Sequence, residues 1–262
     1  MDCRNITINK DKRIGNVIFI VEGRKTEPQI IKNIFERIFG FDVFKTYLDR
    51  DIIRLKKEND IYSKVVIVVN DKPQITESLT DSDYILNMFR LLQSNGLDPF
   101  NSAIYYLFDR DENSSSIVLG LLDKLTNSRD NDDYEMNGLL LLSYPCIEAF
   151  YMNCNEDDKK HNNRKVLKKY IKSSKYNNLN QLKLINGGNE FLRLLKENYN
   201  INLTVSDFDD FKNINKTIFN YEEQHYKEFQ YYHLLSLIFV SLFDLGLIEI
   251  KWKSSLTAFL FY

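Results

Sequence analysis

Four short apolar runs constrain the fold of this chain more than any other feature of its sequence. Each is rich in β-branched, aromatic or leucine residues and is apolar at nearly every position rather than at alternate ones. Such runs are typical of strands buried on both faces, as in the parallel sheets of α/β proteins. We therefore expect buried strands at NVIFIV (16–21), KVVIVV (64–69), AIYYLF (103–108) and GLLLL (138–142).

Segments with helical spacing separate these runs. Apolar residues recur every three or four positions over residues 30–38, after Thr26-Glu27-Pro28, in which Thr26 is a candidate N-cap. Similar spacing predicts helices over residues 84–92 and after Ser114, a second candidate cap. Strands that alternate with amphipathic helices form βαβ units, so the predicted fold class is α/β with a parallel sheet.

The stretch between Gly40 and Asn101 is longer than a simple alternation of strands and helices requires. Besides the second apolar run, it is expected to contain a strand over residues 41–47 and a short charged helix over residues 51–57. This extra material, about residues 41–100, leaves the order of the strands in the sheet open.

From about residue 155 the pattern becomes mainly helical. Residues 191–195 and 221–243 have helical spacing and many aromatic side chains, and neither a fixed repeat nor a long linker precedes them. We expect two parts that pack together. The first is an α/β domain over residues 1–154, and the second is a helical C-terminal region over residues 155–262 that contains a basic helix.

Composition and charge narrow the setting in which the chain acts. Its 262 residues are 44% hydrophobic and 27% charged, which is ordinary for a folded water-soluble protein. The net charge of −2 includes no excess of cations, so a nucleic acid would have to be held by local patches. The three cysteines form no CxxC pair and residues 1–13 hold no apolar segment, so we expect a cytoplasmic protein without a secretory signal. The longest apolar run, 234–243, is shorter than the ~20 residues of a membrane span, so no membrane partner is expected.

Four acidic residues follow the predicted strands. Glu22 comes after the first run, Asp109 and Asp111 after the third, and Glu148 after the fourth. The carboxyl ends of parallel strands meet at one edge of a sheet, and residues i and i+2 of an extended chain point the same way. Converging carboxylates repel one another unless a cation lies between them, and ligands that are all oxygen suit Mg²⁺ or Mn²⁺. Such ions orient phosphodiesters and activate water, so the pattern predicts metal-dependent phosphoryl-transfer chemistry.

Three motifs resemble the Toprim fold of topoisomerases, primases and a set of nucleases. They are VIFIVEGRKTEP, YYLFDRDEN and LLLLSYPCIEAF, within about residues 15–152. The EGxxTEP form and the SYPxxE element are most similar to RloB-like and OLD-like proteins of bacterial and phage-defence systems. The resemblance implies a Toprim-like parallel sheet sandwiched by helices and Mg²⁺-dependent cleavage of nucleic acid, either RNA such as tRNA or DNA. It also implies metal-binding or catalytic roles for Glu22, Asp109, Asp111 and Glu148.

Neighbouring residues are candidates for other roles at this site. Glu22 is either a metal ligand or the group that takes a proton from the attacking water. Arg24 and Lys25 lie on the turn before a helix N-terminus, where they would hold the scissile phosphate or lie solvated on the surface. Arg110 is expected to point away from the two aspartates and to pair with an acidic neighbour. Cys146 is expected to be a buried packing residue and not a nucleophile.

A run of basic residues forms the expected basic helix. Its steps of three and four gather the charges on one helix face with Tyr170 and Tyr176 among them, a pattern that suits a nucleic-acid backbone or a solvated surface. The candidate nucleic-acid-binding residues there are Lys160, Arg164, Lys165, Lys168, Lys169 and Lys172, flanked by Lys159 and Lys175.

Two functions stay open at this point. The first is a Toprim-type metal-dependent endonuclease acting in antiviral defence. The second, which the resemblance implies, is a non-catalytic or partner-activated regulatory module that binds an ATPase partner. Defence proteins of this type often work beside an ATPase, and the chain itself has no GxxxxGK[ST] phosphate loop. A strand-passage or priming enzyme is disfavoured, because 262 residues leave little room for the further domains such enzymes need. The aromatic stripe from Tyr221 to Phe243 is expected to be either core or a homodimer face.

Overall fold

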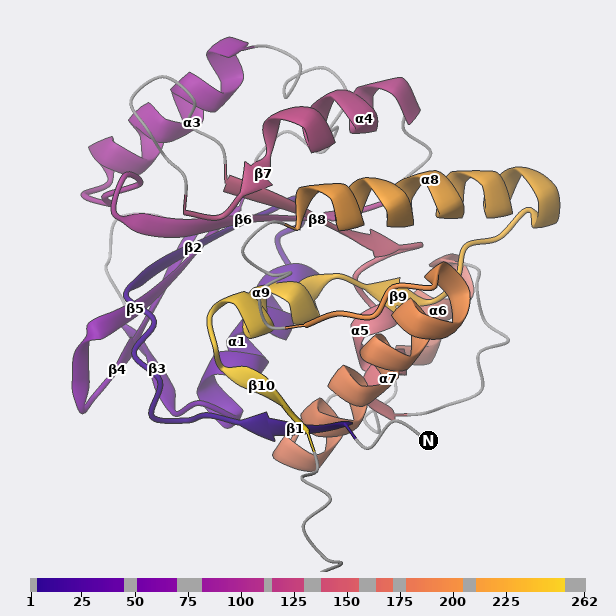
Figure 1. Cartoon of the computed structure of the whole chain (residues 1–262). Coiled ribbons are helices and arrows are strands. Elements are labelled where there is room, and N and C mark those ends of the chain that lie inside the picture. The colour runs from indigo at the N-terminus through magenta and orange to yellow at the C-terminus, as the bar shows by residue number, and fades with distance from the viewer. Residues whose placement is uncertain are drawn as a thin grey trace, which may run out of the picture.

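The computed structural model describes residues 4–44, 51–69, 82–110, 115–129, 138–155, 164–171, 178–204 and 211–252. A central sheet with the strand order β3-β4-β5-β2-β6-β8-β7 organises these residues (Figure 1). Its four middle strands run parallel and contain the four apolar runs of the sequence, so the prediction of buried parallel strands is confirmed. They are β2 (Asn16–Val21), β5 (Asp60–Val69), β6 (Ser102–Asp109) and β8 (Gly138–Tyr144).

Antiparallel strands flank this parallel centre. Beyond β5 lie β4 (Ile52–Lys57) and then β3 (Phe41–Phe44). On the other side, β7 (Thr126–Asn127) and β9 (Leu235–Ser236) pair with opposite ends of β8. The sheet is therefore mixed, and not wholly parallel as the alternation of runs and helices predicts.

The helix expected over residues 51–57 is wrong, because β4 occupies this segment. Its residues pair with β5, from Ile52 opposite Val68 to Lys57 opposite Asp60. The charges in this run favour a solvated helix on local grounds, but a helix of this length is marginal by itself. Pairing with a strongly apolar neighbouring strand, which the local sequence does not reveal, decides the conformation instead.

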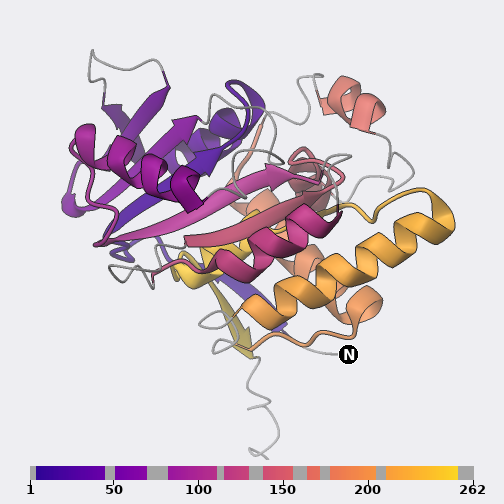
Figure 2. The same ribbon diagram turned by 90° about the horizontal axis from the view of Figure 1, so that it is seen from above.

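Helices cover both faces of the sheet (Figures 1 and 2). On one face lie α3 (Ser82–Ser94), α4 (Ser115–Lys124) and α8 (Lys212–Phe229). On the other lie α1 (Thr26–Arg37), α5 (Ala149–Asn155), α7 (Gln181–Tyr199) and α9 (Ile238–Asp244). A short helix, α6 (Arg164–Ile171), is the described part of the predicted basic helix. The chain is thus an α/β protein with its sheet between two layers of helices.

The helix α1 lies where the spacing of apolar residues predicts it, but its start differs from the prediction. Lys25 is the N-cap residue and makes no side-chain capping bond, while Thr26 is the first helical residue. The predicted capping by Thr26 is therefore wrong. The other candidate cap, Ser114, lies outside the described residues.

The aromatic stripe over residues 221–243 is divided between two helices, with β9 between them. Phe239 and Phe243 on α9 are buried in the core, whereas Tyr221 and Phe229 on α8 are among the exposed large hydrophobic residues. The stripe is therefore core in its C-terminal half and surface in its N-terminal half, and the homodimer face stays a prediction.

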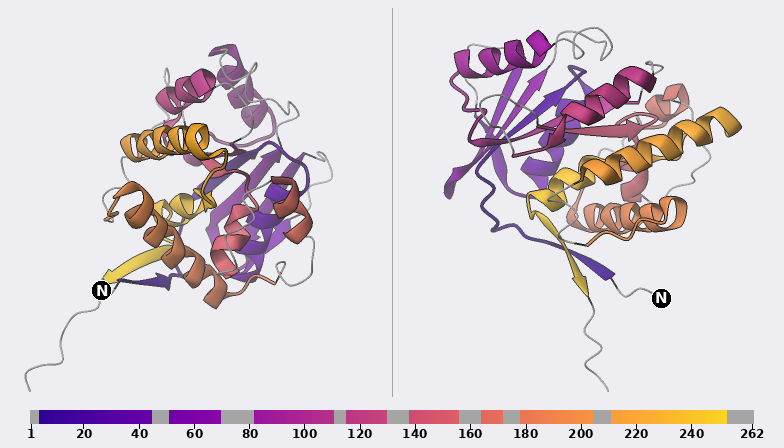
Figure 3. Two further views of the ribbon diagram at one scale, coloured as in Figure 1. Left: turned by 90° about the vertical axis from the view of Figure 1, so that its right-hand side faces the viewer. Right: turned by 45° about the horizontal axis from the view of Figure 1, so that its top comes forward.

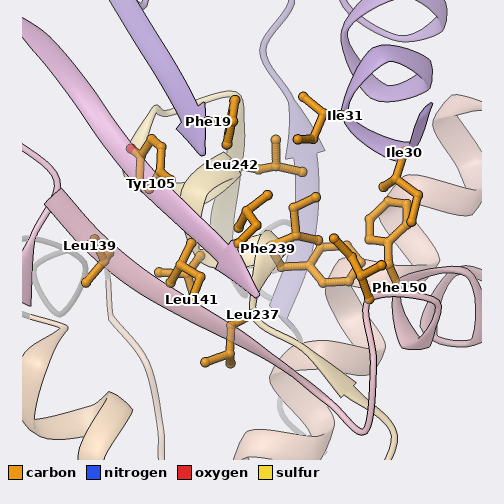
Figure 4. Close-up of a cluster of buried hydrophobic side chains, with 14 of the residues drawn as sticks. Phe19, Ile30, Ile31, Tyr105, Leu139, Leu141, Phe150, Leu237, Phe239 and Leu242 are labelled. Carbon is orange, nitrogen blue, oxygen red and sulfur yellow. The ribbon is translucent and has the colours of Figure 1, made fainter. Parts of the chain in front are cut away.

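One hydrophobic core joins the first strands to the last helices (Figure 4). Phe19 of β2 stacks on Tyr105 of β6 with ring centroids 5.3 Å apart. On the same side of the sheet, Phe239 of α9 packs against Phe150 of α5 at a centroid distance of 5.1 Å. The predicted boundary at residue 154 falls inside α5, and segments on both sides of it contribute to this core and to the sheet.

A second, two-stranded sheet brings together the first and last described strands. The strands β1 (Arg4–Ile8) and β10 (Ile248–Trp252) pair antiparallel over their whole length and lie side by side below the main sheet (Figures 1 and 3). The Asn9 side chain donates a hydrogen bond of 3.0 Å to the Glu249 carboxylate beside this pair. Among the described helices, none has the length and apolar character that crossing a membrane requires.

The helix α7 approaches α5 and α9 closely at Gly187. A Cβ atom at this position would lie 2.7 Å from Cys154 Sγ and 2.7 Å from Phe239 Cζ. It would also lie 3.1 Å from the Cα atom of Cys154, which is backbone and does not swing aside as a side chain does. Space, and not an unusual backbone angle, therefore requires glycine here.

We expect Gly187→Ala to lower the free energy of unfolding by about 1–3 kcal/mol, because overpacking outweighs the ~1 kcal/mol by which alanine favours a helix. Gly120→Ala is the matched control, since Gly120 lies within α4 and a Cβ atom there would meet nothing within 4 Å. This control should be neutral or more stable by up to about 1 kcal/mol. Urea unfolding measures both variants, and an equal effect of the two would contradict the packing argument.

Candidate functional site

The parallel pairing of the central strands brings their carboxyl ends to one edge of the sheet. Glu22 follows the last residue of β2, Asp109 is the last residue of β6, and Glu148 lies in the turn between β8 and α5. Asp109 lies two and four residues after Leu107 and Tyr105, so its side chain shares their face of the sheet, which α1 and α9 cover. Three of the four predicted acidic residues therefore gather at the predicted place.

Hydrogen bonds join this group to the backbone. The Asp109 N–H donates to Glu22 Oε2 over 3.2 Å, and the Ile147 N–H donates to Asp109 Oδ1 over 2.7 Å. Asp109 is 2% exposed and Glu148 is 3% exposed, so both carboxyl groups are shielded from water. These two hydrogen bonds connect the end of β6, where Asp109 lies, to the residue after β2 and to the turn after β8.

A further carboxylate, Glu27, belongs to the same group. It lies in the first turn of α1 and is buried, with its carboxylate directly above Gly23. A Cβ atom at residue 23 would lie 2.4 Å from Glu27 Oε2, so a larger residue there would make the Glu27 carboxylate shift from this position. Glu27 belongs to the EGRKTEP motif, in which the sequence pattern predicts only the start of a helix. The pattern does not show that the Glu27 side chain is buried between the end of β2 and the start of α1, and this burial is what makes it part of the site.

The electrostatics of the group act chiefly on Asp109. Burial, and after it the neighbouring carboxylates of Glu27 and Glu148, raise the pKa of this carboxyl group to about 7. The Ile147 N–H and the Lys168 ammonium act against this shift. Burial also raises the pKa of the Cys146 thiol, with Glu148 and Asp109 adding to the effect, which fits a packing residue better than a nucleophile.

The basic helix reaches the acidic group through one residue. Lys168 of α6 places its Nζ atom 3.9 Å from Asp109 Oδ2. Lys165 and Lys169, on the same helix, are exposed, and the side chain of Arg164 is not described. Of the other sequence candidates, Asp111, Lys160 and Lys172 lie outside the described residues. The structure therefore joins the basic run to the acidic residues at Lys168.

The remaining candidates lie on the two turns that border the group. Arg24 and Lys25 are exposed on the turn between β2 and α1, and Arg24 forms an ion pair of 3.2 Å with Asp51. Arg110 turns to the opposite face, where its guanidinium group donates to both carboxylate oxygens of Glu223 over 2.8 Å. The prediction that Arg110 points away and pairs with an acid is confirmed.

The donor chemistry of this group suits a hard divalent cation. All the donors are carboxylate oxygens, and Glu148 Oε2 is buried without a hydrogen-bond partner. Within the described ranges, no group of three or more His, Cys, Asp or Glu side chains is already arranged to hold a metal ion. One carboxylate oxygen of Glu22 and one of Asp109 accept hydrogen bonds from backbone N–H groups.

No family model, curated protein or solved structure matches the chain. The structure itself describes an α/β protein with several buried acidic residues at the carboxyl edge of a mixed, mostly parallel sheet.

The raised pKa of Asp109 predicts how stability depends on pH in metal-free protein. The folded state keeps a proton on this group up to about pH 7, whereas the unfolded state loses it near pH 4. The stabilisation by this proton is complete below about pH 4 and is lost as the pH rises through about 7. Asp109→Asn keeps an oxygen for the Ile147 N–H and carries no charge.

We therefore expect the variant to gain stability over the wild type as the pH rises from about 4 to about 7, by up to a few kcal/mol. Urea unfolding of both proteins in EDTA measures this difference across the pH range, and titrating groups that do not interact with Asp109 cancel in the comparison. Unfolding free energies that stay parallel over the whole range would contradict the assignment.

Proposed function

We propose that this chain is a Toprim-type nuclease that depends on Mg²⁺ or Mn²⁺ and hydrolyses phosphodiester bonds in bacterial anti-phage defence. Its substrate would be RNA such as tRNA, or DNA. The observation that carries the proposal is the burial of Asp109 and Glu148 beside Glu27 at the carboxyl edge of the parallel strands. The resemblance of the three motifs to Toprim proteins supports it.

The cost of this arrangement argues for a functional role. Carboxylates that are buried near one another lose hydration and repel, and the pKa of Asp109 records both effects. Groups perturbed in this way gather at functional sites, because a ligand bound there offsets the cost. A cation would lower the free energy of the ionised group, and the unpartnered oxygen of Glu148 is available as a ligand.

The residues that would hold the ion are Asp109, Glu148 and Glu22, with Asp111 added on the strength of the resemblance. When bound, the ion would supply positive charge for the phosphodiester and lower the pKa of a water molecule. The chain's own residues would do the rest. Lys168, at the border of the acidic group, would bind a phosphate oxygen, and Arg24 and Lys25 would bind the neighbouring backbone of the nucleic acid. Glu22 or Glu27 would accept the proton of the attacking water.

Cleavage assays test this proposal directly. We expect purified protein to cut tRNA, single-stranded RNA or duplex DNA in Mg²⁺ or Mn²⁺ and not in EDTA. Asp109→Asn and Glu148→Gln should each reduce the rate by about 10²-fold or more, as the loss of a key electrostatic group does in other sites.

The matched control is Asp123→Asn, because Asp123 lies on α4, its side chain is 58% exposed and it pairs with Lys216 away from the acidic group. It should cleave at the wild-type rate. Cleavage that survives EDTA and is unchanged in Asp109→Asn would refute the proposed site.

A second candidate function is a partner-activated or non-catalytic regulatory module that binds an ATPase. The observation that favours it is the position of Lys168, whose ammonium group lies beside the carboxylate that the ion would need. Among the described residues, no group of three or more His, Cys, Asp or Glu side chains is arranged to hold a metal ion, and such an arrangement is compatible with an inactive state. In this form of the proposal, a partner such as a co-encoded ATPase would move Lys168 away and release the site.

Lys168→Met separates the two roles of this lysine, because methionine keeps the length of the side chain and removes its charge. If Lys168 holds the site inactive, the variant should bind Mn²⁺ about tenfold more tightly, as measured by electron paramagnetic resonance. If Lys168 binds substrate, Mn²⁺ affinity should stay nearly constant while nucleic-acid affinity falls. Wild-type behaviour in both measurements would remove Lys168 from either role.

A further inference from the structure

A hollow lies at the end of the sheet opposite to the acidic group. It is bordered by Asn16 and Ser102, the first residues of β2 and β6, and by Lys64 of β5, which pairs with Asn16. The residues after α3, from Gly96 to Asp98, form its wall. Its volume of about 440 Å³ lies in the range of pockets that hold small-molecule ligands.

The register of the strands explains which side chains meet there. One row across the sheet runs from Phe44 through Arg54 and Val66 to Ile18. The row two residues away contains Lys56, Lys64, Asn16 and Ser102. Residues two apart on a strand share a face, so both rows look into the same hollow. That face is the one covered by α3, because the Arg54 guanidinium donates a 2.6 Å hydrogen bond to the Asn95 carbonyl after this helix.

The hollow is positively charged. Arg54, Lys56 and Lys64 line it, and no described acidic side chain forms an ion pair with any of them. The acidic residue of the lining, Asp98, already accepts hydrogen bonds from the backbone and side chain of Asn101. The Nε atom of Arg54 is buried and has no hydrogen-bond partner. A buried guanidinium donor without an acceptor is rare in folded proteins and points to an anion.

The rest of the lining is apolar and includes an aromatic ring. Phe44 is 47% exposed, and Lys56 Nζ lies 4.5 Å from the centre of its ring. Ile18, Val66 and Leu97 complete an apolar floor beside the three cations. A ligand that satisfies both parts carries a phosphate group and a flat ring of limited polarity.

We propose that this hollow binds a free mononucleotide, with its phosphate at Arg54 and Lys64 and its base against Phe44 and the apolar floor. The site is separate from the acidic group, because the two lie at opposite ends of the same parallel strands. The proposal does not depend on nuclease activity. The cations at this end of the sheet would bind a small ligand whether or not the acidic residues at the other end catalyse a reaction.

Isothermal titration calorimetry in EDTA tests the proposal with AMP, GMP and UMP as probes. Inorganic phosphate and adenosine serve as the isolated halves of the ligand. We expect at least one nucleotide to bind, phosphate to bind more weakly and adenosine weakest. Lys64→Gln and Arg54→Gln should each weaken nucleotide binding about tenfold. Lys57→Gln is the matched control, because Lys57 is the neighbour of Lys56 on β4 but does not line the hollow, and it should bind like the wild type.

Two comparisons make the result decisive. Asp109→Asn should keep wild-type nucleotide affinity, because Asp109 lies at the other end of the sheet. Lys64→Gln lies at an exposed position, so its thermal unfolding should match the wild type even if Arg54→Gln perturbs α3. A 5′-phosphorylated dinucleotide carries the same groups as the end of a nucleic-acid strand. If it binds more tightly than every free nucleotide, the hollow holds strand ends and the proposal is overturned. The absence of binding by all three nucleotides, or binding unaffected by Lys64→Gln, would also overturn it.

Discussion

The parallel pairing of β2, β6 and β8 is the constraint on which the rest of this structure depends. It sets Val21 level with Leu107 and Asp109 level with Ser143, so the residues that follow each strand emerge together. The helices α1 and α5 then begin at this edge, and their first turns bury what the strands have gathered there. Because these three strands are in register, Asp109 is subject both to burial and like charge, which raise its pKa, and to the hydrogen bond from Ile147, which lowers it.

Sequence reasoning succeeds where a residue's environment is local and fails where it is decided by a distant partner. An apolar run such as 64–69 is stable only when it is buried, so the sequence predicts its burial. The position of an acidic residue directly after such a run, as Glu22 follows β2, can be predicted in the same way. The strand β4 is charged and becomes a strand only because β5 lies beside it. The strand β9 has two residues, too few for a periodic pattern. The sequence does not predict that Glu27 belongs to the site, because the burial of its side chain depends on how α1 packs over Gly23.

The near-zero net charge of the chain conceals a separation of charge along the strands. The carboxyl edge of the sheet carries Glu22, Asp109 and Glu148, while the amino edge carries Arg54, Lys56 and Lys64. The two groups lie at opposite ends of the parallel strands, too far apart for direct ion pairs between them. A total of −2 is therefore the sum of two opposite surfaces and describes neither of them. An anionic molecule would be drawn to the amino edge, whereas at the carboxyl edge a bound cation, together with Lys168, Arg24 and Lys25, would have to offset the carboxylates.

The pairing of β1 with β10 has a consequence for the order in which the chain folds. Asn9 and Glu249 are 240 residues apart, so β1 meets its partner only after almost everything between them has been synthesised. Until then its backbone N–H and C=O groups have no strand to bond with, and loop closure over such a distance is slow. The two-stranded sheet is thus the last part of the described fold that synthesis allows to form. A ribosome-bound chain would therefore keep the backbone groups of β1 unpaired until β10 has been made.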